Sequence, residues 1–247
     1  MIVKVGTCGF PISRKKYFSE FKVVELNNTF YNIPDGGWLK KIRKEAPRDF
    51  EFTFKAFQGI THDTNSPTWK RSKIDYRKLK GKVGYLRPTK EVFEFWDKMM
   101  EIARILESKI IVIQLPNSFR DDEENLRNSY EFFSSIGKEG IKIAIELRGW
   151  EKKNIEKLCR EFNLIEIVDL VVDRPIFYSE IGYYRLHGRY EGNKIIYGYK
   201  YSDEDMRVLI KKLLEIKNME SYVMFNNSYM YEDSKRFLEI LKCQPIS

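Results

Sequence analysis

Short apolar runs recur along the chain, and most are followed by a segment with helical periodicity. The runs are IVKVG (2–6), KVVELN (22–27), FEFTFKA (50–56), KIIVIQL (109–115), IKIAIEL (141–147), LIEIVDL (164–170), GYYRLHG (182–188) and SYVMFNN (221–227). Their length and their content of β-branched and aromatic residues are typical of buried strands. The pattern therefore predicts eight strands.

The segments between these runs predict amphipathic helices. In 91–107, for example, Val92, Trp96, Met99 and Ala103 fall on one stripe of a helix. The same spacing predicts helices over 35–46, 91–107, 121–138, 151–162, 202–217 and 231–241, whereas the connections after the first and sixth strands look too short or irregular for full helices. Alternating strands and helices favour a parallel sheet. Eight strands in 247 residues, with no linker or repeat, predict an α/β fold of the compact TIM (β/α)8 type, in a single domain over 1–247.

One connection is much longer than the others. It spans about 58–90, between the third strand and its helix, and its part from 62 to 90 carries nine Lys or Arg against two acids. In a barrel the loops that follow the strands form the catalytic face, so this basic insertion should overhang the site. The alternative is an ordinary solvated surface loop.

Composition narrows the choice of partners and cofactors. Lys and Arg number 44 against 36 Asp and Glu, a formal net charge of +8 that favours an anionic small molecule or nucleic acid. Three cysteines with no CxxC spacing fit a reducing cytoplasm better than a disulfide framework. No apolar run approaches the ~18 residues of a membrane span, so no membrane partner is predicted. No glycine-rich nucleotide motif follows a strand, so no cofactor is predicted.

Polar residues gather where the predicted strands end. Because the carboxyl ends of parallel barrel strands meet at one mouth, these side chains should converge. They are Thr7, Cys8, Glu25, Asn27, Asn28, Lys55, His62, Gln114, Glu146, Arg148, Asp169, Arg185, His187, Asn226 and Asn227. So many polar groups exceed what packing alone needs, since buried charges are costly unless they are paired.

Four of these residues are candidate catalytic groups. His187 is one of two histidines in the chain and can transfer protons near neutral pH, with Glu146 or Glu25 as its partner. Lys55 could anchor an anion, act as a general acid, or act as a nucleophile if burial depresses its pKa. The alternative for Glu25 and Glu146 is a structural network in which they neutralise nearby cations.

The stretch YYRLHGRYEG places Arg185, His187 and Arg189 at alternate positions. A strand continuing through 189 would bring all three to one side, and Gly188 would let the backbone turn closely around a ligand. Seven tyrosines lie between 178 and 201, interleaved with cations, and suit either a stacked ring ligand or a well-packed loop. For a metal, a single divalent ion held by Glu25, Glu146 and Asp169 is the alternative to a site without one.

Several strand-end segments carry a resemblance to a known family. VVELNNTFY, FTFKAFQGITHD, IVIQLPNSF, IAIELRGW, YYRLHGRYEG with YGYKYSDED, and YVMFNNSY together resemble the motifs of the domain of unknown function 72 family, also called YecE-like, from residue 5 to about 230. The resemblance implies a TIM barrel, and no established activity. At the N-terminus the chain departs from it, because GFPISRKKYF is shorter than the usual aromatic-rich stretch.

The resemblance also implies a set of site residues that overlaps the strand-end set. Its members are Glu25, Asn27, Thr29, Tyr31, Lys55, Thr61, His62, Gln114, Pro116, Glu146, Arg148, Trp150, Arg185, His187, Gly188, Asn226 and Asn227. The leading hypothesis is an enzyme, a hydrolase or lyase, that acts on a phosphorylated or other anionic substrate by metal-independent acid/base chemistry. Arg185, Arg148, Asn27, His62, Gln114, Asn226, Asn227 and Tyr31 would bind the substrate. The alternatives are a metal-dependent phosphodiesterase or nuclease and a non-catalytic binding module for nucleic acid or another ligand.

Overall fold

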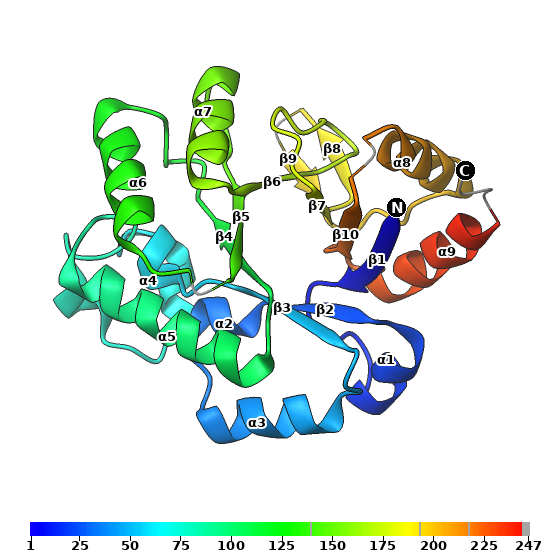
Figure 1. The fold of residues 1–247 in the computed structure, drawn as a ribbon, viewed down its shortest axis with the longest axis horizontal. Helices are drawn as coiled ribbons and strands as arrows, with labels where there is room; N and C mark the ends of the chain where they lie inside the picture. Colours follow the sequence, from blue (N-terminus) through cyan, green and yellow to red (C-terminus); the bar gives the residue numbers. More distant parts are fainter. Residues whose placement is uncertain (139, 193, 217, 244–247) are drawn as a thin grey trace.

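The computed structural model describes residues 1–138, 140–192, 194–216 and 218–243. In this part of the chain eight parallel strands form a barrel with helices around it (Figure 1). The barrel strands are β1 (Ile2–Thr7), β2 (Val23–Leu26), β3 (Glu51–Lys55), β4 (Ile110–Gln114), β5 (Lys142–Glu146), β6 (Ile165–Val168), β7 (Ile181–Leu186) and β10 (Glu220–Phe225). The predicted fold class and all eight predicted strands are confirmed.

The strand order explains how the sheet closes. Neighbours run β1-β10-β7-β6-β5-β4-β3-β2, each pair parallel. A single parallel bridge between Cys8 and Glu25 then brings the two edge strands, β1 and β2, together. The result is a nearly closed ring of strands with its carboxyl ends on one side.

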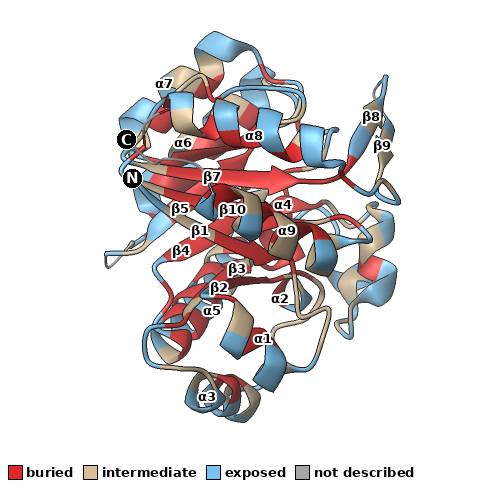
Figure 2. Cartoon of the chain, turned by 90° about the vertical axis from the view of Figure 1, so that its right-hand side faces the viewer, coloured by how far each residue is buried: buried red, intermediate tan, exposed pale blue. Residues whose placement is uncertain are grey.

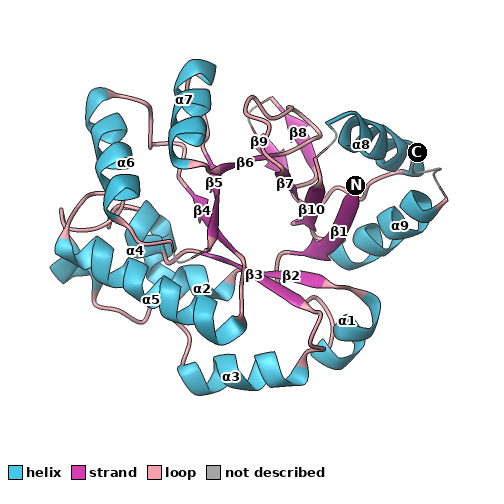
Figure 3. Cartoon of the chain, viewed as in Figure 1, coloured by secondary structure: helices cyan, strands magenta, loops and turns pink. Residues whose placement is uncertain are grey.

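The helices form the outer layer (Figure 3). They are α1 (Arg14–Glu20), α3 (Gly36–Glu45), α5 (Lys90–Leu106), α6 (Glu123–Ser135), α7 (Lys152–Phe162), α8 (Asp203–Ile216) and α9 (Met230–Lys242). The short α2 (Asn28–Tyr31) follows β2 directly, at the carboxyl end of the barrel. All six predicted helices are present. The connection after the first strand holds only the seven-residue α1, and residues 169–180 contain no helix, in line with the sequence.

Side-chain caps fix where several helices begin. Asp35 and Asp122 accept hydrogen bonds from backbone N–H groups in the first turns of α3 and α6. Ser202 and Asp205 bond reciprocally before α8, because the Ser202 N–H donates to the Asp205 carboxylate and the Asp205 N–H donates to the Ser202 hydroxyl. Such caps satisfy donors that have no partner within the helix.

Three clusters of buried apolar residues hold the layers together. The barrel strands are largely buried and the helices are exposed on their outer sides (Figure 2). Outward-facing strand residues pack against the helices. Inside the barrel a separate cluster includes Ile110, Val112, Tyr183 and Tyr222, and the rings of the two tyrosines stack at 5.7 Å. This cluster fills the lower barrel, so it forms a packed floor beneath the mouth.

Two further segments shape the mouth. The insertion contains α4 (Gln58–Thr61) and two short 3-10 helices, η1 (Pro67–Arg71) and η2 (Tyr76–Leu79). It is anchored by the buried Trp69, whose indole N–H bonds the carbonyl oxygens of His62 and Asp63 at 3.2 and 3.0 Å. Beyond β7, the antiparallel hairpin of β8 (Arg189–Glu191) and β9 (Lys194–Ile196) projects from the barrel (Figure 2).

Candidate functional site

The alternation of side chains along each strand decides which residues face the mouth. On β4, for example, Ile110 and Val112 belong to the inner cluster, so Gln114 continues the same inward row one layer higher. The mouth holds a cavity of about 330 Å³. Its lining includes Asn27, Phe30, Tyr31, Lys55, His62, Thr68, Gln114, Arg148, Arg185, His187, Tyr197 and Asn226. Nine of the predicted site residues are thus brought together, from six strand ends, α2 and the insertion.

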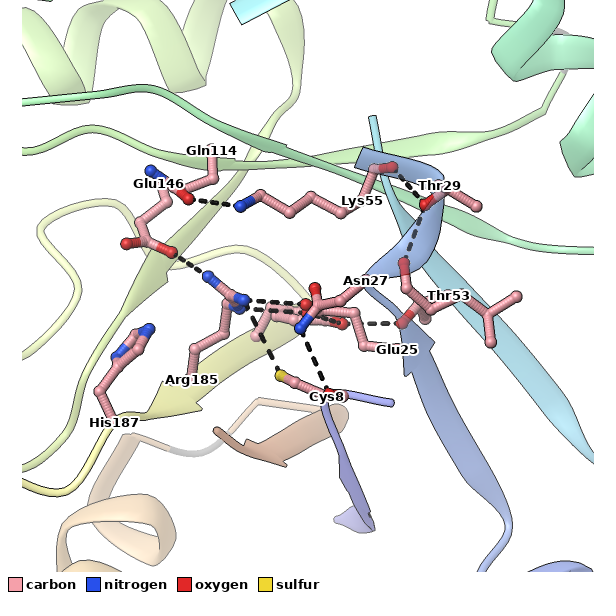
Figure 4. Close-up of polar contacts among 12 residues, drawn as sticks. Cys8, Glu25, Asn27, Thr29, Thr53, Lys55, Gln114, Glu146, Arg185 and His187 are labelled. Carbon is pink, nitrogen blue, oxygen red and sulfur yellow. Dashed lines mark hydrogen bonds and ion pairs between the residues drawn. The ribbon is translucent and has the colours of Figure 1, made fainter. Parts of the chain in front are cut away.

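Arg185 lies at the floor of this cavity and is held by two carboxylates (Figure 4). Its Nη1 donates to Glu146 Oε2 at 2.6 Å, and its Nη2 and Nε donate to the two oxygens of Glu25 at 2.9 and 3.2 Å. The Tyr183 hydroxyl donates to the same Glu25 carboxylate at 2.9 Å. Burial would lower the pKa of Arg185, but the charge of Glu25 raises it well above its usual value. The guanidinium is therefore fixed and neutralised, which favours a role in organising the site over the predicted binding of an anion.

Glu146 belongs to the same network. Its Oε1 accepts a hydrogen bond from Arg148 Nε at 2.7 Å, while Oε2 is held by Arg185. Burial would raise the pKa of Glu146, but the charges of Arg185 and Arg148 hold it far below its usual value. Arginines occupy both carboxylates, so Glu146 and Glu25 form the structural network that was the alternative for them, and their partnership with His187 in proton transfer stays a prediction.

His187 takes a different carboxylate as its partner. Asp169 Oδ2 accepts hydrogen bonds from the His187 backbone N–H at 2.9 Å and from Tyr190 Oη at 3.0 Å, and it lies 3.1 Å from His187 Nδ1. Because an ionised carboxylate only accepts hydrogen bonds, Nδ1 carries the proton in this arrangement. In the neutral ring Nε2 is then the basic nitrogen.

Lys55 projects from the end of β3 into the cavity. Its Nζ donates to Gln114 Oε1 at 2.6 Å and lies 3.8 Å from the centroid of the Phe30 ring. Burial lowers the pKa of Lys55 to about 7, and the charge of Arg185 contributes in the same direction. The amine is therefore partly neutral at physiological pH.

His62 shares the Phe30 platform with Lys55. The rings of His62 and Phe30 meet edge to face with their centroids 4.9 Å apart. His62 Nδ1 lies 2.7 Å from the Thr61 hydroxyl oxygen. Burial lowers the pKa of His62 to about 3, and the charges of Lys55 and Arg148 add to the effect. This imidazole is neutral at pH 7, so it serves as a hydrogen-bonding group of the cavity wall.

Two asparagines contribute amide groups to the lining. Asn27 Nδ2 bonds the Cys8 carbonyl at 3.3 Å, whereas its Oδ1 is buried and has no hydrogen-bond partner within the described chain. An unpaired buried acceptor beside a cavity suits a ligand hydroxyl or amide donor. Asn226 also lines the cavity. Asn227 does not, because its amide points outward and donates to Asp233 Oδ2 at 2.7 Å, so the prediction that Asn227 contacts substrate does not fit the structure.

The expectation that Arg189 joins Arg185 and His187 is also wrong. The strand ends at Leu186, and Gly188 turns the chain with φ of +108°. A Cβ at this position would lie 2.4 Å from the Ile196 carbonyl oxygen, so only glycine fits. Arg189 consequently begins the β8–β9 hairpin and is exposed.

A larger cavity of about 610 Å³ adjoins the first, since Arg148 and His187 line both. It extends toward Trp150, Glu166 and Tyr190, between the loops after β5 and β6 and the hairpin. The two cavities together offer more room than the inner one alone.

The three carboxylates predicted as metal ligands are not grouped. Arg185 lies between Glu25 and Glu146, and Asp169 is occupied by His187 and Tyr190. Across the described parts of the chain, no group of three or more His, Cys, Asp or Glu side chains is placed to hold a metal ion. The side chains at the mouth therefore do not fit the predicted carboxylate-bound ion.

Some site residues escaped sequence reasoning. Phe30 and Thr68 line the cavity but lie on α2 and the insertion, where strand alternation gives no signal. Tyr197, which also lines the cavity, is one of the seven tyrosines that the sequence offered for stacking on a ring ligand. Asp169 stood among the strand-end residues, yet its pairing with His187 was not predicted. β6 and β7 are neighbouring strands, and the alternation along each places Asp169 and His187 on the inner side. That alternation could have suggested the pair.

The barrel with its polar mouth defines a TIM-barrel protein of unknown function. A family model, described as protein of unknown function DUF72, matches residues 13–244, so the chain belongs to the DUF72 family and the resemblance noted in the sequence is confirmed. A DUF72 protein from Enterococcus faecalis has 17% identity and a TM-score of 0.73, with 98% of this chain and 96% of that chain covered. One from Thermotoga maritima has 21% identity and a TM-score of 0.69, with 98% and 100% covered.

A third solved structure shares the fold more distantly. It is a D-psicose 3-epimerase crystallised in the presence of D-fructose, with 11% identity, a TM-score of 0.59, and 97% of this chain and 98% of that chain covered. No curated protein matches the chain. Among the described residues, no helix is long and apolar enough to cross a membrane.

Proposed function

We propose that this protein is an enzyme that moves protons to and from a small, polar, anionic substrate at the barrel mouth. The observation that carries the proposal is the presence of Lys55, with a pKa of about 7, and the carboxylate-held His187 in one cavity. A group that titrates near the working pH is suited to act as a general acid or base. The reaction needs no metal in this proposal, since the chain supplies both groups.

The charges around the cavity suit a substrate with one anionic group. Arg185, Arg148 and a protonated Lys55 balance Glu25, Glu146 and Asp169, so the site has no large excess of positive charge. Arg148 is accessible to a ligand, because 31% of its side chain is exposed. Asn27 Oδ1 supplies an acceptor for a substrate hydroxyl. A hydroxylated acid or sugar phosphate fits these contacts, and the sugar epimerase with a similar fold supports that class.

The proposal is tested by proton exchange. Phosphorylated sugars, sugar acids and hydroxyaldehydes are incubated with the protein in D₂O, and NMR detects deuterium incorporated at carbon. We expect exchange with the wild type, loss of exchange with Lys55→Met or His187→Gln, and retention with the matched surface variant Lys22→Met. Exchange that persists in both site variants would exclude the proposed groups.

Nucleic acid is a second candidate ligand because of the basic insertion. Arg71 of η1 lies 3.7 Å over the ring of Tyr31, which lines the cavity. A cation stacked on an aromatic ring at the rim suits a phosphate chain with adjacent bases. The buried anchor Trp69 gives this segment a fixed structure, which a merely solvated loop does not need.

A further inference from the structure

We infer that Lys55 forms a covalent imine with a carbonyl carbon of the substrate, so that the substrate is an aldehyde or ketone. The inference rests on the proposed function and deepens it. Lys55 Nζ faces the cavity, its hydrogen-bond partner is the neutral amide of Gln114, and no carboxylate forms an ion pair with it in the described residues. An amine without a counter-ion is free to lose its proton and attack a carbonyl.

The surroundings of Lys55 keep the amine both dry and fixed. The Phe30 ring covers one side at 3.8 Å, and the Thr29 hydroxyl donates to the Lys55 carbonyl at 2.6 Å, which holds the end of β3 against α2. Arg185 stands below as a fixed positive charge. Burial of the amine and the charge of Arg185 favour the neutral amine, which is the nucleophilic form.

The covalent step balances without any co-reactant. The Nζ lone pair forms a bond to the carbonyl carbon as the carbonyl π bond breaks, and a proton moves from nitrogen to oxygen. A second proton follows as the C–O bond breaks, so water leaves and the C=N bond forms. His187 Nε2 is the basic nitrogen placed to carry these protons. Protonation of the imine then gives an electron sink for cleavage of an adjacent C–H or C–C bond, as in a lyase.

A second lysine provides an internal comparison. Burial also lowers the pKa of Lys138, whose Nζ donates to the Phe162 carbonyl at 2.7 Å. Lys138 lies after α6 and does not line the mouth cavity. If a depressed pKa alone determined reactivity, both lysines would react with a carbonyl probe. The inference requires reaction at Lys55 in preference to Lys138.

The experiment traps the imine on the full chain. Protein is incubated at pH 7.5 with D-glyceraldehyde 3-phosphate or pyruvate, reduced with sodium borohydride, digested and analysed by mass spectrometry. We expect the reduced adduct at Lys55 to form at least about tenfold faster than at Lys138 or the exposed lysines. Lys55→Arg should abolish this fast adduct, and Lys138→Arg should leave it unchanged.

The outcomes separate this inference from the proposed function. Equal labelling of Lys55 and Lys138 with both probes would overturn the imine. If Lys55→Met also abolishes deuterium exchange in that case, the proton-transfer function stands without the covalent step. Fast labelling of Lys55 that persists in His187→Gln at the wild-type rate would retain the imine and remove His187 as the proton carrier.

Discussion

Gln114 and Glu146 are paired in register on the neighbouring strands β4 and β5, and each contacts different cations of the site. Glu146 accepts hydrogen bonds from Arg185 and Arg148, whereas Gln114 accepts one from Lys55 at 2.6 Å. The choice of an amide at 114 leaves Lys55 without a carboxylate partner. This difference of one functional group between neighbouring strands keeps one cation of the site titratable.

The first prediction concerns Gln114. Replacing it with glutamate gives Lys55 an ion pair, which should raise the pKa of Lys55 by about one unit or more. The pH at which Lys55 becomes half-reactive toward D-glyceraldehyde 3-phosphate and borohydride should rise accordingly. Gln114→Met, which adds no charge, serves as the control. An unchanged midpoint in Gln114→Glu would mean that solvent screens the contact.

The second prediction concerns the buried network. Arg185→Met leaves Glu25 and Glu146 without their shared cation, and such a loss typically costs about 3–5 kcal/mol. For a domain of this size the melting temperature should fall by about 10 °C. Lys22→Met is the matched control, because its ion pair with Asp49 is exposed. Similar melting temperatures for the two variants would contradict a structural role for Arg185.

The third prediction concerns Asp169 as a positioning residue. Asp169→Asn should shift the proton of His187 away from Nδ1, which ¹⁵N NMR of the imidazole detects directly. Exchange of substrate protons should slow by about 10²-fold or more, since general acid/base catalysis is typically worth that much. An unaltered tautomer in Asp169→Asn would show that another group fixes the ring.

The fourth prediction concerns pH and stability. The pKa of Lys55 is about 7 in the folded protein and about 10.4 when unfolded, so between these values the unfolded state binds more protons and stability rises with pH. Lys55→Met removes this penalty. It should therefore melt above the wild type at pH 7, with the difference shrinking toward pH 10. A difference that does not vary with pH would contradict the depressed pKa.

The fifth prediction concerns the basic insertion. Neutralising Lys70, Arg71 and Lys73 together should weaken the binding of an oligonucleotide and flatten its salt dependence. The control is the triple neutralisation of Lys40, Lys41 and Lys44, which are exposed on α3. Filter binding over a range of salt concentrations measures both. Equal loss in the two triple variants would indicate a general charge effect.

The sequence alone determined the barrel and its inward rows. The hydrophobic runs set the eight strands, and the period of two along each strand placed Lys55, Gln114 and His187 on the inner side. Along the last strand Tyr222 and Asn226 face inward, so the alternation predicts that Asn227 faces outward. Its amide does so and donates to Asp233.

Only the tertiary structure decided how these groups pair. His187 pairs with Asp169 and not with Glu146. Arg185 extends across the barrel and donates hydrogen bonds to both Glu25 and Glu146. The amine of Lys55 owes its lowered pKa to burial and to Arg185, with the ring of Phe30 beside it. Partner choice depends on distances and on burial between segments far apart in the chain. The periodicity of a single segment predicts which way a side chain points. It carries no information on distances or burial between segments, so it does not predict the partner of that side chain.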